Sequence, residues 1–124
     1  NLLVCDLGTA STLNYINNKS QLEGGLILPG LDLNIRSLAD NTGLLKEVSK
    51  DGKVSLTAKN TDENIRSGIV LSQVYTIERY AKEHNAKIIL TGGNSFYIKD
   101  YFSEGYHFDQ YLLLEGLVNF VEEK

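Results

Sequence analysis

The sequence predicts an α/β domain built on a mixed sheet. Its first thirty residues contain three short apolar stretches joined by polar turns, a pattern typical of an antiparallel three-stranded meander. Two stretches with helical spacing of apolar residues follow, and the apolar run 86–90 then ends in a glycine turn. A helix that leads into a short apolar strand indicates a parallel connection, so we expect antiparallel and parallel strands in one sheet.

Composition indicates one globular domain, residues 1–124, and excludes some classes of partner. Of the 124 residues 42% are hydrophobic and 23% charged. A net charge of −4 without a Lys/Arg cluster argues against nucleic-acid binding. No apolar run has the length of a membrane span, and no secretory signal is visible. A single cysteine, Cys5, inside an apolar strand reads as a buried hydrophobe, and we expect a reducing, cytoplasmic setting.

The three expected strands are justified by their turns. The first apolar run, 2–5, ends on a carboxylate and a glycine, and the second, 12–16, ends in a polar turn. The third strand, 21–28, contains two adjacent glycines, which weaken a sheet unless backbone or a ligand must come close. Pro29 and Gly30 end this strand and open a helix.

Two helices and a loop are expected next. Apolar residues recur at helical spacing from Leu31 until Gly43 ends the run, and we expect this helix to pack on the sheet. The polar stretch 47–59 reads as a loop or flap.

A longer helix runs from near Thr61 to about residue 84, with Asn60 or Thr61 as its N-cap. Gly68 in its middle costs about 1 kcal/mol relative to alanine, which indicates close helix packing or a partner subunit.

The last part of the chain should hold a short helix at 94–102, a short edge strand at 106–108 and a final helix at 112–122. The resulting order β-β-β-α-α-β-α-β-α, with glycine-rich turns at strand ends, is that of an actin-like, ribonuclease H-like ATPase domain. We therefore expect helices on both faces of the sheet.

The turn between the first two strands carries a candidate phosphate site. Gly8 lets the backbone bend closely past a ligand. Hydroxyl and N–H groups that can hold phosphate oxygens are supplied by Thr9, Ser11 and Thr12. Asp6 is placed to bind a cation that accompanies a phosphate. On these residues alone an ordinary hairpin turn is the favoured interpretation.

Six motifs in order resemble the C-terminal half of the type III pantothenate kinase family, which includes Bvg accessory factor-like proteins. They are D-L-G-T-A-S-T at 6–12, G-G-L-I-L-P-G at 24–30, the segment 38–45 with T-G-L-L, N-T at 60–61 followed by S-G at 67–68, T-G-G at 91–93 and L-L-L-E-G-L at 112–117. The resemblance covers nearly the whole chain. It implies ATP-dependent phosphorylation of pantothenate, the first step of coenzyme A synthesis.

The resemblance also implies roles for individual residues. Asp6 resembles the aspartate that binds a monovalent cation, potassium or ammonium, and Thr9 resembles a threonine that contacts ATP. Gly92 and Gly93 resemble the glycine turn near the adenosine, and Thr61 resembles the threonine that reaches pantothenate. Whether magnesium accompanies ATP stays open. The family's active site is shared across a homodimer, so self-association is implied.

Two motifs of the family are missing from this chain. The first phosphate turn, D-x-G-N-T, and the G-x-D-R segment that carries the catalytic base lie upstream of Asn1 in the family, so the chain holds no candidate catalytic residue. Because it lacks methionine and opens inside a strand, we expect Asn1 not to be the natural start, and the chain to be inactive alone. Alternatives are a non-catalytic half-domain or accessory binding protein of the same fold, and half of a sugar kinase.

Overall fold

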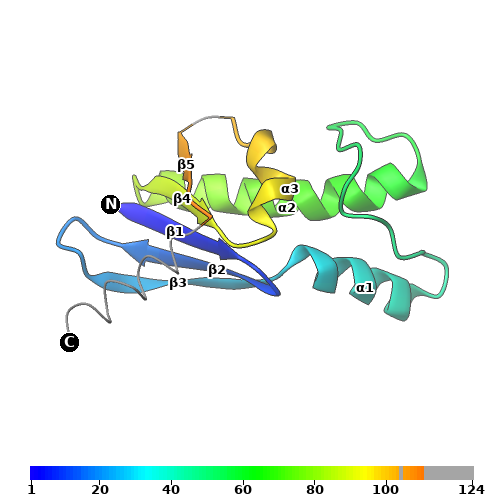
Figure 1. Ribbon diagram of the computed structural model, residues 1–124, viewed down its shortest axis with the longest axis horizontal. Coiled ribbons are helices and arrows are strands. Elements are labelled where there is room, and N and C mark those ends of the chain that lie inside the picture. The colour runs from blue at the N-terminus through cyan, green and yellow to red at the C-terminus, as the bar shows by residue number, and fades with distance from the viewer. Residues whose placement is uncertain (104, 111–124) are drawn as a thin grey trace.

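A five-stranded mixed sheet forms the centre of the domain (Figure 1). The computed structural model describes residues 1–103 and 105–110. Across the sheet the strand order is β3-β2-β1-β4-β5. The predicted combination of antiparallel and parallel strands is therefore confirmed.

The strands fall into two groups. β1 (Leu2–Leu7), β2 (Ala10–Ile16) and β3 (Leu22–Pro29) form the predicted antiparallel meander. β4 (Lys87–Thr91) pairs parallel to β1, and β5 (Tyr106–Phe108) pairs parallel to β4. β1 thus lies in the middle of the sheet. The turn between β1 and β2 and the turn that follows β4 both lie beside its C-terminal end.

The described residues form four helical segments beside the sheet. These are α1 (Leu31–Thr42), α2 (Thr61–Glu83), the short α3 (Ser95–Ile98) and the 3₁₀ helix η1 (Lys99–Tyr101). The predicted cap of α2 is confirmed, because the Asn60 side chain accepts a hydrogen bond from the Glu63 N–H at 2.9 Å. Residues 44–60, between α1 and α2, contain no helix or strand, as the loop interpretation predicts.

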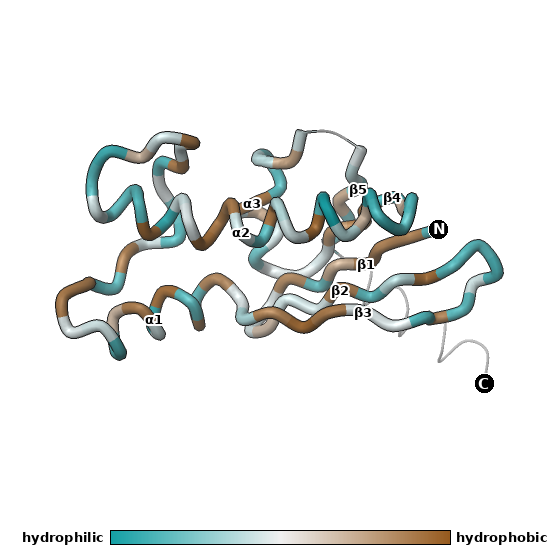
Figure 2. Tube along the Cα trace, turned by 180° about the vertical axis from the view of Figure 1, so that it is seen from behind, coloured by the Kyte–Doolittle hydropathy of each residue, from teal (hydrophilic) through white to brown (hydrophobic). Residues whose placement is uncertain are grey.

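The hydrophobic core lies between the sheet and α2. Alternate residues of β1 are fully buried, and they share one cluster with residues of α2 and β4; its most buried members are Leu3, Cys5, Leu13, Val74, Ile77 and Leu90. In Figure 2, hydrophobic and hydrophilic residues alternate along α2, as a helix with one buried face requires. No described helix is both long and apolar enough to cross a membrane.

The position of α1 differs from the prediction. Figure 1 shows α1 projecting past the end of the sheet next to the N-terminal part of α2. Leu31 and Ile35 of its first turns are buried in the core, and the rest of α1 packs on α2. Helical periodicity identifies an apolar stripe but not its partner, which here is a helix. The predicted final helix, 112–122, lies outside the described residues, so the expected second helical layer stays a prediction.

Candidate functional site

Three turns meet at the C-terminal end of β1. The Gly30 N–H, at the junction of β3 and α1, donates to the Thr9 carbonyl at 3.0 Å. The Asn94 N–H, in the turn between β4 and α3, donates to the Leu7 carbonyl at 2.9 Å. The structure therefore brings the predicted Gly8 and Thr9 next to the Gly92–Asn94 turn. We call this place, formed by Asp6 to Thr9, Gly30 and Gly92 to Asn94, the turn site.

Asp6 lies half-buried in the turn site, beside Gly92. Gly92 has a φ of +92°, and a Cβ there would lie 2.7 Å from Asp6 Oδ1 and 2.7 Å from the Leu7 carbonyl oxygen. Without a side chain, Gly92 packs closely against the Asp6 carboxylate and the Leu7 carbonyl, where a methyl group would have no room. The Asp6 carboxylate and the Leu7 carbonyl are oxygen donors of the type that suits a hard cation, and cation binding at Asp6 stays a prediction. Among the residues that the structure describes, no group of three or more His, Cys, Asp or Glu could hold a metal ion.

The three predicted hydroxyl residues lie in different environments. Thr9 is exposed, and Thr12 is half-buried directly opposite Asp6 in the β1–β2 ladder. Ser11 is only 2% exposed, because in β2 it shares its face with buried Leu13. Thr9 and Thr12 can therefore meet a ligand at the turn site, whereas the Ser11 hydroxyl lies inside the domain.

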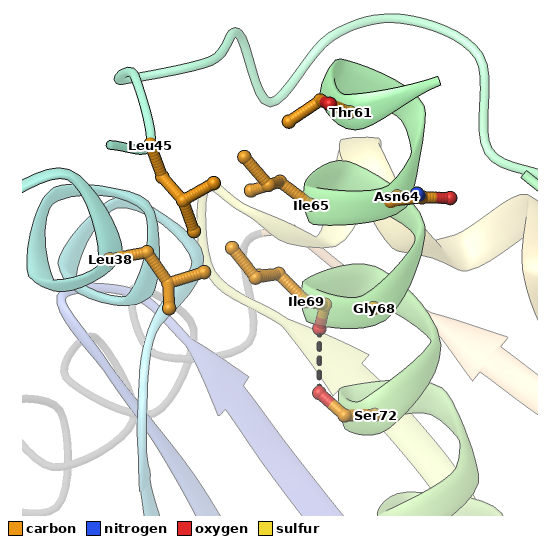
Figure 3. A pocket seen from close by; sticks show the side chains of 8 residues that line it. All are labelled: Leu38, Leu45, Thr61, Asn64, Ile65, Gly68, Ile69 and Ser72. Atoms are coloured by element: carbon orange, nitrogen blue, oxygen red, sulfur yellow. Dashed lines mark hydrogen bonds between the residues drawn. The ribbon is translucent and has the colours of Figure 1, made fainter. Parts of the chain in front are cut away.

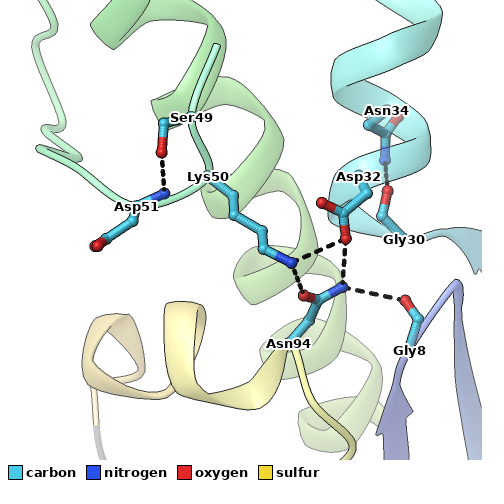
Figure 4. A network of polar contacts seen from close by, with 8 residues as sticks. All are labelled: Gly8, Gly30, Asp32, Asn34, Ser49, Lys50, Asp51 and Asn94. Atoms are coloured by element: carbon cyan, nitrogen blue, oxygen red, sulfur yellow. Dashed lines mark hydrogen bonds and ion pairs between the residues drawn. The ribbon is translucent and has the colours of Figure 1, made fainter. Parts of the chain in front are cut away.

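A polar network that the sequence did not predict closes one side of the turn site (Figure 4). Its centre is Asn94, which is 7% exposed. Asn94 Nδ2 donates to the Gly8 carbonyl at 3.2 Å and to Asp32 Oδ2 at 3.4 Å. Lys50 Nζ donates to Asn94 Oδ1 at 2.9 Å and to Asp32 Oδ2 at 3.0 Å. Helix α1, the 44–60 loop and the Gly92–Asn94 turn are thus joined to the first turn.

Lys50 dominates the electrostatics of this network. The hydrogen bond from Lys50 is the main cause that lowers the pKa of the Asp32 carboxyl below its ordinary value. The Lys50 ammonium also lies 4.7 Å from the centre of the Tyr97 ring, a cation–π distance. The network therefore holds the Lys50 ammonium, paired with Asp32, close to the turn that carries Gly8.

The predicted pantothenate residue, Thr61, lies elsewhere. It lines an open hollow of about 410 Å³ between α1 and α2, together with apolar Leu38, Leu45, Ile65 and Ile69 (Figure 3). Gln73 of the same helix donates to the Pro29 carbonyl at 2.8 Å, which places Gln73 level with the end of β3. Thr61 precedes Gln73 by twelve residues, roughly 18 Å along a helix. The structure therefore does not bring Thr61 to the turn site within one chain.

Gly68 borders the same hollow. A Cβ built at Gly68 would meet no heavy atom within 4 Å. Of the two predicted reasons for this glycine, close packing within the described part of the chain is wrong. A partner subunit remains the other explanation.

Comparison with known proteins identifies the family. The sequence model of the type III pantothenate kinases matches residues 1–83. The chain belongs to this family. The resemblance predicted from the sequence motifs is confirmed, and the match is to the C-terminal half of the family's proteins.

Two type III pantothenate kinases illustrate the similarity. That of Persephonella marina is 38% identical over 122 residues, covering 94% of this chain and 48% of the relative. That of Azobacteroides pseudotrichonymphae is 35% identical over 121 residues, covering 94% and 49%. The chain thus spans about half the length of the curated relatives it matches.

A solved structure shares the fold. The crystal structure of a protein described as a Baf family transcriptional activator from Campylobacter jejuni superposes with a TM-score of 0.80 at 24% identity. The superposition covers 99% of this chain and 58% of that protein. The two proteins therefore share the arrangement of sheet and helices at low sequence identity.

Proposed function

We propose that this chain is the C-terminal half of an enzyme that phosphorylates pantothenate with ATP, the first step of coenzyme A synthesis. The observation that supports this best is the meeting of two glycine turns around Asp6, in a chain of this family. Phosphoryl transfer needs positioned N–H groups, hydroxyls and cations more than it needs covalent chemistry. The turn site offers these groups, on a domain that we propose to be actin-like.

Each predicted residue receives a role in this proposal. Gly8 and Thr9 hold the phosphates of ATP, and Thr12 offers its hydroxyl next to Asp6. Asp6 and the Leu7 carbonyl bind a potassium or ammonium ion, which offsets the charge of the nucleotide; magnesium bound to ATP would add to this. Gly92 and Gly93 adjoin the adenosine. Ser11, being buried, supports the turn from within.

No residue of this chain is proposed as the catalytic base. The relatives are about twice as long as the chain, and the base is expected in their other half. ATP, the phosphoryl donor, is available in the cytoplasm, where we place the protein.

The pantothenate site is proposed to require two copies of the protein. Thr61 and the turn site lie too far apart in one chain, but a homodimer with α2 at its interface can bring Thr61 of one copy to the turn site of the other. The exposed Gly68 and the hollow beside Thr61 support such an interface.

The decisive experiment uses the protein as it occurs in its source. We expect it to convert pantothenate to phosphopantothenate with ATP, and we expect its intact mass to be about twice that of one such domain. A protein that binds ATP but does not phosphorylate pantothenate would be a non-catalytic relative. That result would overturn the proposed function.

The Asp6 assignment has its own test. Asp6→Asn should remove the potassium dependence of ATP binding, because the amide no longer offers a charged ligand to the cation. Asp40→Asn, at an exposed position of α1, removes the same charge away from the turn site. This variant should keep the potassium dependence of ATP binding. Calorimetric titration of ATP in potassium and in a large organic cation measures the difference. Equal potassium dependence in Asp6→Asn and the wild type would refute the assignment.

The dimer can be tested at Gly68. Gly68→Gln should leave the fold intact, since the position faces open space and glutamine favours a helix by about 1 kcal/mol over glycine. At a dimer interface the added side chain would clash. We expect light scattering to show a dimer for the wild type and a monomer for the variant. An unchanged mass, with unchanged thermal unfolding, would exclude α2 from the interface.

A further inference from the structure

Building on the proposed function, we propose that Lys50 is a positioning residue for the nucleotide. It acts through Asn94 on the peptide group between Gly8 and Thr9, and the segment that carries it is held in place by Arg66. We call this segment, residues 49–53, the strap.

The strap is fastened to α2 by several contacts. Arg66 donates from Nε to the Ser49 carbonyl at 2.7 Å and from Nη1 to the Lys53 carbonyl at 3.1 Å. Gly52 lies against the guanidinium, since a Cβ there would be 2.7 Å from Arg66 Cζ. One guanidinium thus binds both ends of the strap, and its planar fork of donors suits this task.

The fastened strap places Lys50 above the turn site (Figure 4). The Lys50 side chain is 28% exposed, so most of its length is covered. Its ammonium donates to Asn94 and Asp32 and lies over the Tyr97 ring. These contacts come from two segments distant in sequence, α1 and residues 94–97, and together they fix the position of the ammonium group.

Lys50 determines how the Asn94 amide is oriented. The side-chain carbonyl of Asn94 faces the ammonium, and the NH₂ group therefore faces the Gly8 carbonyl. Without Lys50, the buried Asn94 oxygen would lose its donor, and only the hydrogen bonds from Nδ2 to Gly8 and Asp32 would hold the amide. The Asn94 side chain would then be free to shift, and its hydrogen bond to the Gly8 carbonyl would weaken.

The Gly8 carbonyl and the Thr9 N–H belong to one planar trans peptide group and point in opposite directions. Holding the Gly8 carbonyl therefore aims the Thr9 N–H. The Thr9 carbonyl is held as well, by the Gly30 N–H, and within the described part of the chain the Thr9 N–H meets no acceptor. Both carbonyls of the turn are thus bound from inside the protein, and the N–H is left to an anion such as a nucleotide phosphate.

The first test compares Lys50→Met with Lys53→Met. Both remove one positive charge from the strap, but the Lys53 side chain makes no ion pair or hydrogen bond to the described residues. We expect Lys50→Met to raise the ATP dissociation constant roughly tenfold, the effect of one lost hydrogen bond. Lys53→Met should leave it unchanged. Equal weakening in both variants would mean that only net charge matters, which would overturn the proposal.

A second variant separates positioning from direct contact. Asn94→Leu keeps Lys50 but breaks its connection to Gly8, so it should weaken ATP binding as much as Lys50→Met. Full affinity in Asn94→Leu would show that Lys50 acts on ATP directly and not through Asn94. If this variant does not fold, Arg66→Lys replaces it, because it loosens the strap without touching Asn94, with Arg79→Lys on the same helix as its control.

A readout without nucleotide keeps this inference separate from the proposed function. In NMR spectra of the ligand-free protein, Lys50→Met should shift the Gly8 and Thr9 amide signals, and Lys50→Arg should restore them; Lys53→Met should not move them. Unmoved Gly8 and Thr9 signals in Lys50→Met would refute the positioning role. A wild type that binds no ATP, with these signals shifted as expected, would refute the proposed function alone.

Discussion

Replacing Gly92 with alanine tests whether the turn site depends on the absence of one side chain. The new Cβ would lie 2.6 Å from the Leu7 nitrogen, 2.7 Å from Asp6 Oδ1 and 2.7 Å from the Leu7 carbonyl oxygen. Two of these atoms belong to the backbone of the central strand, which cannot rotate away as a flexible side chain can. The substitution must therefore move β1 or the glycine turn.

Two separate costs contribute to the expected effect. A left-handed backbone conformation costs an ordinary residue about 1–2 kcal/mol, and Gly92 has a φ of +92°. Forcing a methyl group into a filled space costs about 1–3 kcal/mol more. We expect the free energy of unfolding to fall by roughly 2–5 kcal/mol. Since 1 kcal/mol shifts the midpoint by about 4 °C in a domain of this size, thermal unfolding should occur about 8–20 °C lower.

The neighbouring glycine is the matched control. A Cβ at Gly93 would meet nothing within 4 Å, and Gly93 has no positive φ, so Gly93→Ala should unfold within about 0.5 kcal/mol of the wild type. Urea unfolding followed by circular dichroism gives both free energies. Equal stability of the two variants would refute the steric argument. It would also mean that the turn site does not depend on a glycine at position 92.

Two further predictions concern titratable groups. Burial raises the pKa of the Cys5 thiol from an ordinary value of 9.0 to about 12. Between these two values only the unfolded chain ionises its thiol, so the free energy of unfolding should fall as the pH rises through this interval. Cys5 should then react with a thiol reagent at pH 8 only as fast as the protein opens, and a reaction as fast as that of a free thiol would contradict its burial. The pKa of Asp32 is lowered chiefly by Lys50, so its contribution to stability is present above about pH 4 and is lost as the pH falls through the lower folded pKa. A carboxyl titration by NMR should show the Asp32 pKa returning toward its ordinary value in Lys50→Met, and an unchanged titration would exclude Lys50 as the cause.

The strands and helices could be predicted because their signals are local. The Asn60 cap, the glycine end of α1 and the apolar run in β4 each lie within a few residues of the boundary they set. The meeting of Gly8 with Gly92 was also accessible, since turns that follow adjacent parallel strands share an edge of the sheet. The family motifs added residue roles to a fold that periodicity had already indicated.

Other features of the site have a weaker signal in the sequence, or none at all. Ser11 stands two positions before buried Leu13 in a strand, so alternation alone indicates that both face the core. Lys50 had no such signal. Its loop lacks periodicity, and its partner Asn94 is 44 residues away. Asn94 itself resembles a helix cap, but its side chain makes no capping hydrogen bond and serves the network instead.

The central pairing of β1 with β4 has a consequence for the order in which the domain folds. The meander needs only short loops to close, whereas Gly8 and Asn94 come together across 86 residues. The turn site can therefore form only after the longest loop of the described fold has closed, and its hydrogen bonds should be absent from the folding transition state. Damage to the network should speed unfolding and leave the folding rate nearly unchanged. A variant with a damaged turn site would thus still reach the folded state, but it would survive for a shorter time.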